Sequence, residues 1–99
     1  MAFSFLTQEI AMDLGTANTV IFRNDDIVMD APSIVAIDNN TGKCIAIGQQ
    51  AKLMHEHTNP GIKTIRPLRN GVIADFNAAE MMIKGFIKQV NNKKRSLFA

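Results

Sequence analysis

Short apolar runs alternate with clusters of Gly, Asn and Asp along most of the chain. Such runs, bounded by turn-forming residues, are typical of antiparallel strands joined by tight turns. We expect strands at Ile10–Met12, Thr19–Phe22, Ile27–Met29, Ser33–Ile37, Lys43–Ile47, Ile62–Ile65 and Val72–Ala74. Pro32 cannot donate to a ladder, so it should end the third strand. The segment from Gln49 to about His57 has helix-forming content and ends at the turn cluster Thr58–Gly61.

The C-terminal part of the chain carries one apolar stripe at helical spacing. Its members are Ala79, Met82, Ile83, Phe86, Ile87 and Val90. The helix should begin at Asp75 or Asn77, because either can cap it, and Asn77 with Glu80 makes a variant of the capping box. Gly85 inside the stripe costs about 1 kcal/mol relative to Ala, so packing must hold this helix. Together the elements predict an α+β or α/β fold of antiparallel strands with two helices.

Composition places the chain among globular domains. It has 99 residues, of which 46% are hydrophobic and 20% charged, enough to bury a small core in one domain. The net charge of +2 is too small to indicate nucleic acid. No apolar run approaches the roughly 18 residues of a membrane span, and the first nine residues lack the basic region of a signal peptide. The lone Cys44 should be a small core residue in a reducing compartment, which indicates a cytoplasmic protein.

The segment Asp13–Thr19 carries the clearest chemical signal. An acid at the end of an apolar strand precedes Gly15 and other small residues, and a second strand follows. A tight hairpin of this kind can direct several backbone amides into one concavity, which binds anions and phosphates above all. It is not a Walker A loop, because no Gly-Lys-Ser/Thr follows, and a dinucleotide fingerprint would need a helix next. A plain turn that needs Gly15 and Asn18 for its geometry explains the residues equally well.

The position of Asp13 favours a cation between the protein and a phosphate. At about 4 Å and an effective dielectric constant of ~20, two like charges repel by roughly 4 kcal/mol. Mg²⁺ is commonly held by one or two carboxylates together with water and substrate phosphates. The segment is therefore interpreted as half of a magnesium–nucleotide site.

Other polar residues give weaker signals. His55 and His57 stand two apart on the expected helix, where they share no face, so we expect two exposed side chains. The segment Asp38–Gly42 has part of a calcium-loop pattern without the remaining ligand spacing, which favours a turn. Arg66 and Arg69 could bind an anion or a partner, although structural ion pairs are the better expectation.

Two large apolar residues, Leu97 and Phe98, follow a basic run in what should be a loop. Burying each is worth about 1.5–3 kcal/mol, and each basic residue near an anionic leaflet adds about 1 kcal/mol. One interpretation is a weak, reversible membrane anchor. The other is the start of a core strand, which these magnitudes alone slightly favour.

Three stretches, in this order and spacing, resemble the MreB family of bacterial actin-like proteins: Ile10–Thr19, Pro32–Ile37 and Ile65–Phe76. This family shares a superfamily with actin, sugar kinases and the heat-shock ATPase chaperones. The resemblance covers essentially all of this chain, but only the N-terminal minority of a family member.

The resemblance implies a partial actin-like ATPase lobe. Residues 1–32 would hold the first strands of subdomain IA with the first phosphate loop, residues 33–72 the small subdomain IB, and residues 73–99 the IA helix and the start of a membrane loop. The implied ligands are ATP and Mg²⁺, with Asp13 acting on the metal through water. The implied phosphate loop consists of Gly15, Thr16, Ala17, Asn18 and Thr19.

The family resemblance also implies partners and a location. Such proteins polymerise with themselves on the inner face of the cytoplasmic membrane and guide the cell-wall elongation machinery, which maintains rod shape. Leu97 and Phe98 would fall in a membrane-inserting loop, which raises the anchor interpretation above the strand, and Phe3, Phe5 and Leu6 could add to it. No nucleic acid partner is implied.

Family members carry the second phosphate loop and the residues that orient the attacking water farther downstream. We therefore expect no catalytic residue and no ATPase activity in this chain alone, and an unpaired apolar edge on its first sheet. Two alternatives remain at this point. One is another superfamily member, such as a small-molecule kinase, which would share the turn at Asp13–Thr16. The other is a free-standing module that interacts with filaments.

Overall fold

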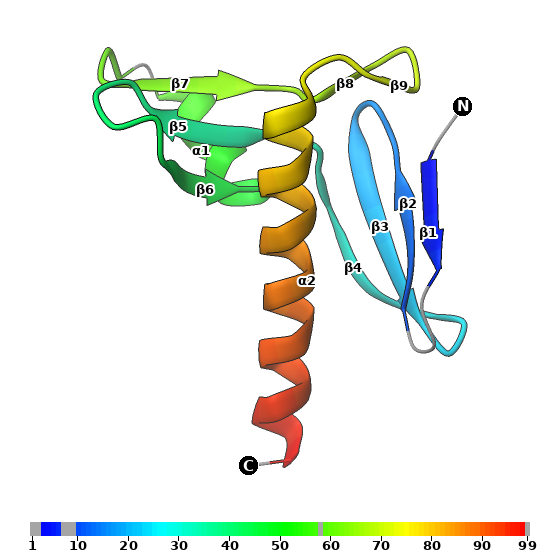
Figure 1. Ribbon diagram of the computed structural model, residues 1–99. Coiled ribbons are helices and arrows are strands. Elements are labelled where there is room, and N and C mark those ends of the chain that lie inside the picture. The colour runs from blue at the N-terminus through cyan, green and yellow to red at the C-terminus, as the bar shows by residue number, and fades with distance from the viewer. Residues whose placement is uncertain (1–2, 7–9, 58, 99) are drawn as a thin grey trace.

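The computed structural model describes residues 3–6, 10–57 and 59–98, with backbone alone for residues 3–6 and 93–98. The strands are β1 (Phe3–Leu6), β2 (Ile10–Leu14), β3 (Asn18–Arg23), β4 (Asp26–Pro32), β5 (Val35–Asp38), β6 (Cys44–Ile47), β7 (Ile62–Ile65), β8 (Leu68–Arg69) and β9 (Val72–Ile73). The helices are α1 (Gln49–Glu56) and α2 (Phe76–Phe98). Figure 1 shows the sheet of β1–β4 and the sheet of β5–β7 on either side of the long helix α2, and β8 and β9 pair as a third, two-stranded sheet. The predicted antiparallel strands and two helices are confirmed.

The first sheet is an antiparallel meander in the order β1-β2-β3-β4. Met12 pairs with Ile21 across β2 and β3, and both side chains, together with Leu14, are buried toward α2. Because side chains alternate along a strand, Asp13 and its cross-strand neighbour Val20 lie on the opposite face. One face of this sheet therefore belongs to the core, and the other carries the predicted acid.

The first sheet begins with a strand that the apolar pattern did not predict. Phe3–Leu6 forms β1, which pairs antiparallel with β2 from Phe3 opposite Leu14 to Leu6 opposite Ala11. This strand was missed because the N-terminal run was treated only as a membrane candidate. The expectation of an unpaired apolar edge on the first sheet stays a prediction. The run is apolar and lies three residues before β2, so the entropy lost on closing the connecting loop is small.

The second sheet, in the order β6-β5-β7, has a helix against each face. Ile34 and Ala36 pack in a cluster with Ala51 of α1. Val35 and Ile37 face the other way, into the core that α2 shares with the first sheet. The strand β5 is therefore buried on both faces, as its continuous apolar run requires.

Asp75 is the residue that caps α2. The backbone N–H of Ala78 donates to Asp75 Oδ1 at 3.0 Å, which is the bond that an N-cap side chain makes to the third helical residue. The alternative capping box of Asn77 and Glu80 is wrong, because Asn77 already lies inside the first turn and Glu80 pairs with Lys84 at 3.0 Å.

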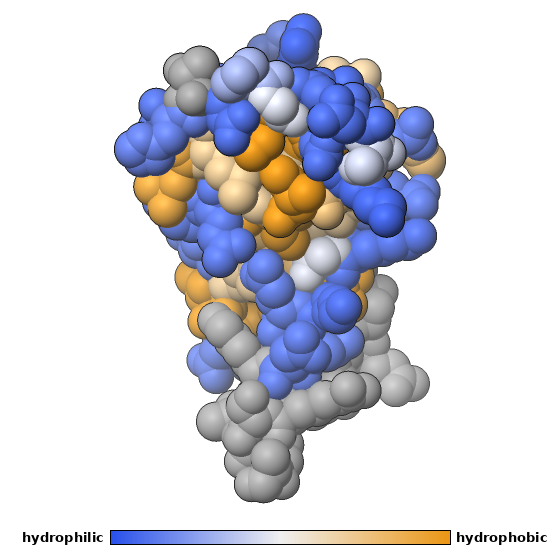
Figure 2. Space-filling view, turned by 90° about the vertical axis from the view of Figure 1, so that its left-hand side faces the viewer, coloured by the Kyte–Doolittle hydropathy of each residue, from blue (hydrophilic) through white to orange (hydrophobic). Residues whose placement is uncertain are grey.

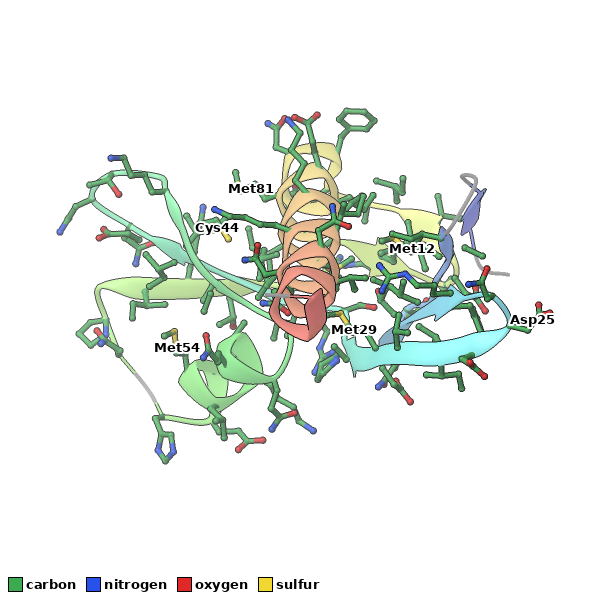
Figure 3. The ribbon with its side chains drawn as sticks, turned by 90° about the horizontal axis from the view of Figure 1, so that it is seen from below. Met12, Asp25, Met29, Cys44, Met54 and Met81 are labelled. Carbon is green, nitrogen blue, oxygen red and sulfur yellow. The ribbon has the colours of Figure 1, made fainter. Side chains whose placement is uncertain are left out.

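The predicted stripe on α2 is confirmed as the main contact surface of the helix. Ala79, Met82, Phe86 and Val90 are buried. In Figure 3, α2 lies between the sheets, with Met12 and Met29 on the side of the first sheet and Cys44 and Met81 on the side of the second. A Cβ atom at Gly85 would collide with the side chain of Ile47, so the glycine allows α2 to approach β6 closely.

The C-terminal end of α2 also differs from the expected loop. The helix continues to Phe98, because neither Gly nor Pro follows Gly85 before that point. The side chains of Leu97 and Phe98 lie outside the described residues, so their proposed contact with a membrane stays a prediction. No helix in the described part of the chain is both long and apolar enough to cross a membrane.

Candidate phosphate-binding site

The β2–β3 hairpin closes through a three-residue connection, Gly15–Ala17. The N–H of Gly15 donates to the carbonyl oxygen of Asn18 at 3.0 Å. A Cβ atom at Gly15 would lie only 2.5 Å from that same oxygen. Only glycine fits at this position, because any side chain would collide with the Asn18 carbonyl oxygen. The N–H of Gly15 is hydrogen-bonded within the turn and is not available to a ligand.

The next two amides are available to a ligand. The backbone N–H groups of Thr16 and Ala17 have no acceptor within the part of the chain that the structure describes, and both residues are exposed. The hydroxyl of Thr16 accepts a hydrogen bond from the N–H of Gly71 at 2.8 Å, which ties the tip of the hairpin to the β8–β9 turn. The tip thus presents two amides from a connection that is fixed by the Gly15–Asn18 hydrogen bond and by the contact of Thr16 with Gly71.

The buried hydroxyl groups of Ser33 and Thr19 stabilise the hairpin connection. Ser33 Oγ donates to the carbonyl oxygen of Gly15 at 2.7 Å, and Thr19 Oγ1 lies 2.8 Å from Ser33 Oγ. The N–H of Ser33 donates to Ala17 O at 2.8 Å. Both hydroxyl residues are fully buried, so Thr19 supports the connection rather than facing a ligand. Sequence reasoning missed Ser33, and its only signal was its place in the stretch Pro32–Ile37.

Asp13 has an unsatisfied oxygen. Its Oδ1 atom is shielded from solvent and has no hydrogen-bond partner among the described residues. A buried acceptor without a partner costs about 1–3 kcal/mol, and more when it is charged. No group of three or more His, Cys, Asp or Glu residues in the described chain could hold a metal. A single carboxylate with an unpartnered oxygen is the kind of group that holds Mg²⁺ together with water and substrate phosphates.

Asn18 occupies the other flank of the tip. Its side-chain amide donates to Asp30 Oδ1 at 3.2 Å, and both residues are exposed. This contact orients Asn18 along the first sheet toward β4. The six site residues thus fall into three groups: amides at the tip, an unsatisfied acid beside it, and residues that shape or support the hairpin.

The remaining candidates are placed away from this tip. His55 and His57 are exposed as expected, and His55 Nδ1 lies 2.6 Å from Thr64 Oγ1. The turn after β5 is closed by the carboxylate of Asp38, which accepts from the N–H of Asn40 at 2.7 Å, so the prediction of a plain turn is confirmed.

Two expectations about individual side chains are wrong. Cys44 is exposed rather than in the core, because β6 is an edge strand of the second sheet. Its side chain is still partly buried, and this desolvation raises the pKa of the thiol. Arg66 and Arg69, which are both exposed, form no ion pair within the described residues.

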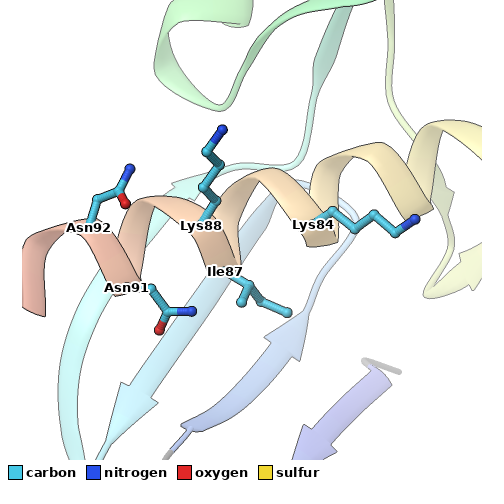
Figure 4. Close-up of a pocket in the computed structure, with 5 residues that line it drawn as sticks. All are labelled: Lys84, Ile87, Lys88, Asn91 and Asn92. Carbon is cyan, nitrogen blue, oxygen red and sulfur yellow. The ribbon is translucent and has the colours of Figure 1, made fainter. Parts of the chain in front are cut away.

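Surface hollows elsewhere lack the chemistry of a nucleotide site. The one in Figure 4 is lined by a single face of α2, with Lys84, Ile87, Lys88, Asn91 and Asn92. Figure 2 shows an apolar patch with a polar surround on the side of the second sheet. A second hollow lies between β6 and α2, and one of its lining residues is Ile45, which is 44% exposed.

Comparison with known proteins gives consistent matches. The family model of the MreB/Mbl protein matches residues 7–99. The chain is 47% identical over 87 residues to the cell shape-determining protein Mbl of Bacillus subtilis, covering 87% of this chain and 26% of that protein. It is 47% identical over 91 residues to the cell shape-determining protein MreB of Haemophilus influenzae, with the same coverage. The chain thus spans about a quarter of the length of these relatives.

Solved structures agree with the sequence matches. MreB5 of Spiroplasma citri bound to ADP superposes with a TM-score of 0.72 at 35% identity, covering 83% of this chain and 25% of that one. MreB5 bound to AMPPNP gives a TM-score of 0.68 at 39% identity, covering 74% and 22%. The fold is therefore a partial actin-like fold, as predicted.

Proposed function

The chain belongs to the MreB/Mbl protein family, and from this premise we propose that its β2–β3 hairpin contributes to an ATP and Mg²⁺ site in a filament-forming protein that maintains cell shape. We also propose that the protein is cytoplasmic and that it associates with the inner face of the membrane and with the cell-wall elongation machinery. Family membership favours this function over the small-molecule kinase that the Asp13–Thr16 turn alone allowed.

One observation carries the nucleotide proposal: Asp13, with a shielded oxygen that has no partner among the described residues, lies three residues before Thr16, and the amides of Thr16 and Ala17 also lack an acceptor there. The amides would bind phosphate oxygens, and Asp13 would hold Mg²⁺ through water. When bound, the metal neutralises charge between the carboxylate and the phosphates. In support, the related MreB5 of Spiroplasma citri has been solved with ADP and with AMPPNP.

Titration of this chain with ATP, with and without Mg²⁺, followed by backbone amide NMR, tests the nucleotide proposal. We expect saturable shifts at Thr16 and Ala17 at millimolar ligand that strengthen when Mg²⁺ is added. Asp13→Asn should remove the strengthening by Mg²⁺, because a neutral amide holds the hydrated cation poorly. Asp26→Asn is the matched control, since Asp26 is exposed at the start of β4. An equal effect of Mg²⁺ in wild type and Asp13→Asn would contradict the proposal.

The membrane proposal rests on Leu97 and Phe98 at the end of α2. A single anchor of this size gives marginal binding, and a filament that presents many copies raises the avidity steeply. Replacing both residues with Ser should reduce co-sedimentation with anionic vesicles. Phe76→Ser is a matched control, because Phe76 is 71% exposed at the opposite end of the same helix. If both variants lost vesicle binding equally, the binding would be non-specific hydrophobic adsorption, and a specific anchor at Leu97 and Phe98 would be refuted.

A further inference from the structure

The β8–β9 turn carries the one Asn-Gly pair of the sequence, Asn70–Gly71. Arg69 pairs with Val72 across the turn, so these two residues form the whole connection. Both have a positive φ, 53° at Asn70 and 75° at Gly71, as a two-residue hairpin turn of type I′ requires. Asn70 is exposed, and its side-chain amide has no hydrogen-bond partner within the part of the chain that the structure describes. The pair therefore combines a free side-chain amide with a following residue that has no side chain.

Such a pair can react with itself. The backbone nitrogen of Gly71, after losing its proton to hydroxide, attacks the side-chain carbonyl carbon of Asn70. A carbon–nitrogen bond forms, the bond to the side-chain amino group breaks, and ammonia leaves with a proton taken from water. Water then opens the cyclic imide at either carbonyl, which gives aspartate or isoaspartate without any oxidation or reduction. Glycine favours the first step, because it has no Cβ atom to hinder the approach of its nitrogen.

One hydrogen bond restrains the reacting nitrogen. The N–H of Gly71 donates to Thr16 Oγ1 at 2.8 Å, so the proton that must leave is held by the hydroxyl, and Figure 1 shows the β8–β9 turn beside the tip of the β2–β3 hairpin. The turn itself is weakly supported, because β8 and β9 have two residues each and a lone two-stranded hairpin is marginal in water. Local opening of such a segment exposes its amides at little cost in free energy. The Thr16 contact therefore opposes the opening that the reaction needs.

We propose that Asn70 is a site of spontaneous deamidation and that the Thr16 hydroxyl limits its rate by holding the Gly71 N–H. The two products differ in their effect on the turn. Aspartate keeps the backbone and adds one negative charge. Isoaspartate carries the chain through the former side chain and lengthens the backbone by one carbon, which a two-residue turn cannot accept in its present register. The isoaspartate product therefore loses the hydrogen bond between Gly71 and Thr16.

Deamidation changes the surroundings of the hairpin tip. Thr16 supplies one of the two backbone amides that lack an acceptor among the described residues, and its side chain is the group that Gly71 bonds. A negative charge at Asn70 opposes an anion at these amides, and isoaspartate also removes one of the contacts that fix the hairpin connection. This consequence rests on the proposed nucleotide function of the hairpin, whereas the reaction itself does not.

The test is incubation of the 99-residue chain at mildly alkaline pH, with each asparagine followed over time by mass spectrometry of proteolytic peptides. The change of an amide to an acid alters the peptide mass, and chromatography separates the aspartate and isoaspartate forms. We expect Asn70 to react before any other asparagine, and more slowly in the folded chain than in urea. No nucleotide is needed, so failure of the hairpin function would leave this result unchanged.

Variants of Thr16 test the restraint. Thr16→Ala should speed deamidation in the folded chain about fivefold, the factor that one net hydrogen bond is worth. Thr16→Ser keeps the hydroxyl and should react at close to the wild-type rate. Thr41→Ala is the matched control, because Thr41 is also an exposed turn residue and makes no bond to Gly71. Thr16 is exposed, so both of its substitutions leave the core intact.

Three results would overturn the proposal. If another asparagine reacts first in the folded chain, or Asn70 stays unmodified while it reacts in urea, the assignment of the site is refuted. If Thr16→Ala and Thr41→Ala react at the same rate, Thr16 exerts no restraint. If Thr16→Ser is as fast as Thr16→Ala, the hydroxyl is not the restraining group.

Discussion

The first and second sheets share one buried cluster with α2 but differ on their other faces. The second sheet has α1 against its far face, so Ala36 and Val35 of β5 are both completely buried. The first sheet buries Met12 and Leu14 against α2, and neither helix in the described part of the chain covers its other face, which carries Asp13, Asn18 and Asp30. A strand covered on both sides holds mainly apolar residues. The sheet with one open face is therefore the one that can present chemistry.

Phe86→Ala should have the largest effect, because Phe86 is 1% exposed at the centre of the core common to both sheets. Deleting a buried Phe side chain typically costs about 3–5 kcal/mol. Urea unfolding followed by circular dichroism measures the loss. Phe76→Ala on the same helix should change the unfolding free energy by less than about 0.5 kcal/mol, since exposed sites rarely contribute more. Similar losses at both positions would show that α2 is not packed as described.

Valine truncation compares the two sheets directly. Val35 of β5 is fully buried, whereas Val20 of β3 is half-buried on the open face. Val35→Ala should cost about 2–3 kcal/mol through lost apolar burial and the cavity left behind, and Val20→Ala about 1 kcal/mol or less. Equal losses would mean that the far face of the first sheet is covered in solution.

Ser33→Ala should weaken the hairpin without touching its tip. The change removes the donor to Gly15 O and leaves the buried Thr19 hydroxyl without its partner. Leaving buried polar groups unsatisfied costs about 1–3 kcal/mol. Thr41→Ala, at an exposed turn, is the control. Hydrogen exchange at residues 14–19 should accelerate in Ser33→Ala alone, and unchanged exchange would contradict the supporting role.

Asp75→Ala should have the smallest of these effects. Loss of an N-cap side chain typically lowers the free energy of unfolding by about 1 kcal/mol. Because α2 packs against both sheets, hydrogen exchange should report the same loss of stability in each sheet. Asn77→Ala should be nearly neutral, because Asp75 is the residue that bonds the N–H of Ala78. A greater loss from Asn77→Ala than from Asp75→Ala would reverse the assignment of the cap.

Most local elements were predictable because their causes lie close together in the sequence. Asn18–Arg23, Ile62–Ile65 and the stripe on α2 follow from apolar periodicity. The wrong predictions concern residues whose surroundings are set by parts of the chain that are distant in sequence. Cys44 looked like a core residue because its run is apolar, yet whether such a run is central or at an edge depends on strand order. The two-residue strand β8 is too short to leave any periodic signal.

The sequence alone determined the hairpin connection at Gly15–Ala17, the acid that precedes it and the family, because these depend on residue types within a few positions of one another. The tertiary structure decided three further things: that β1 closes the edge of β2, that Asp13 Oδ1 is shielded without a partner, and that Lys52 and Arg66 meet beside Ala17. The physical reason is distance along the chain. Lys52 and Arg66 follow the hairpin by more than thirty residues in the sequence, and the fold places both beside Ala17.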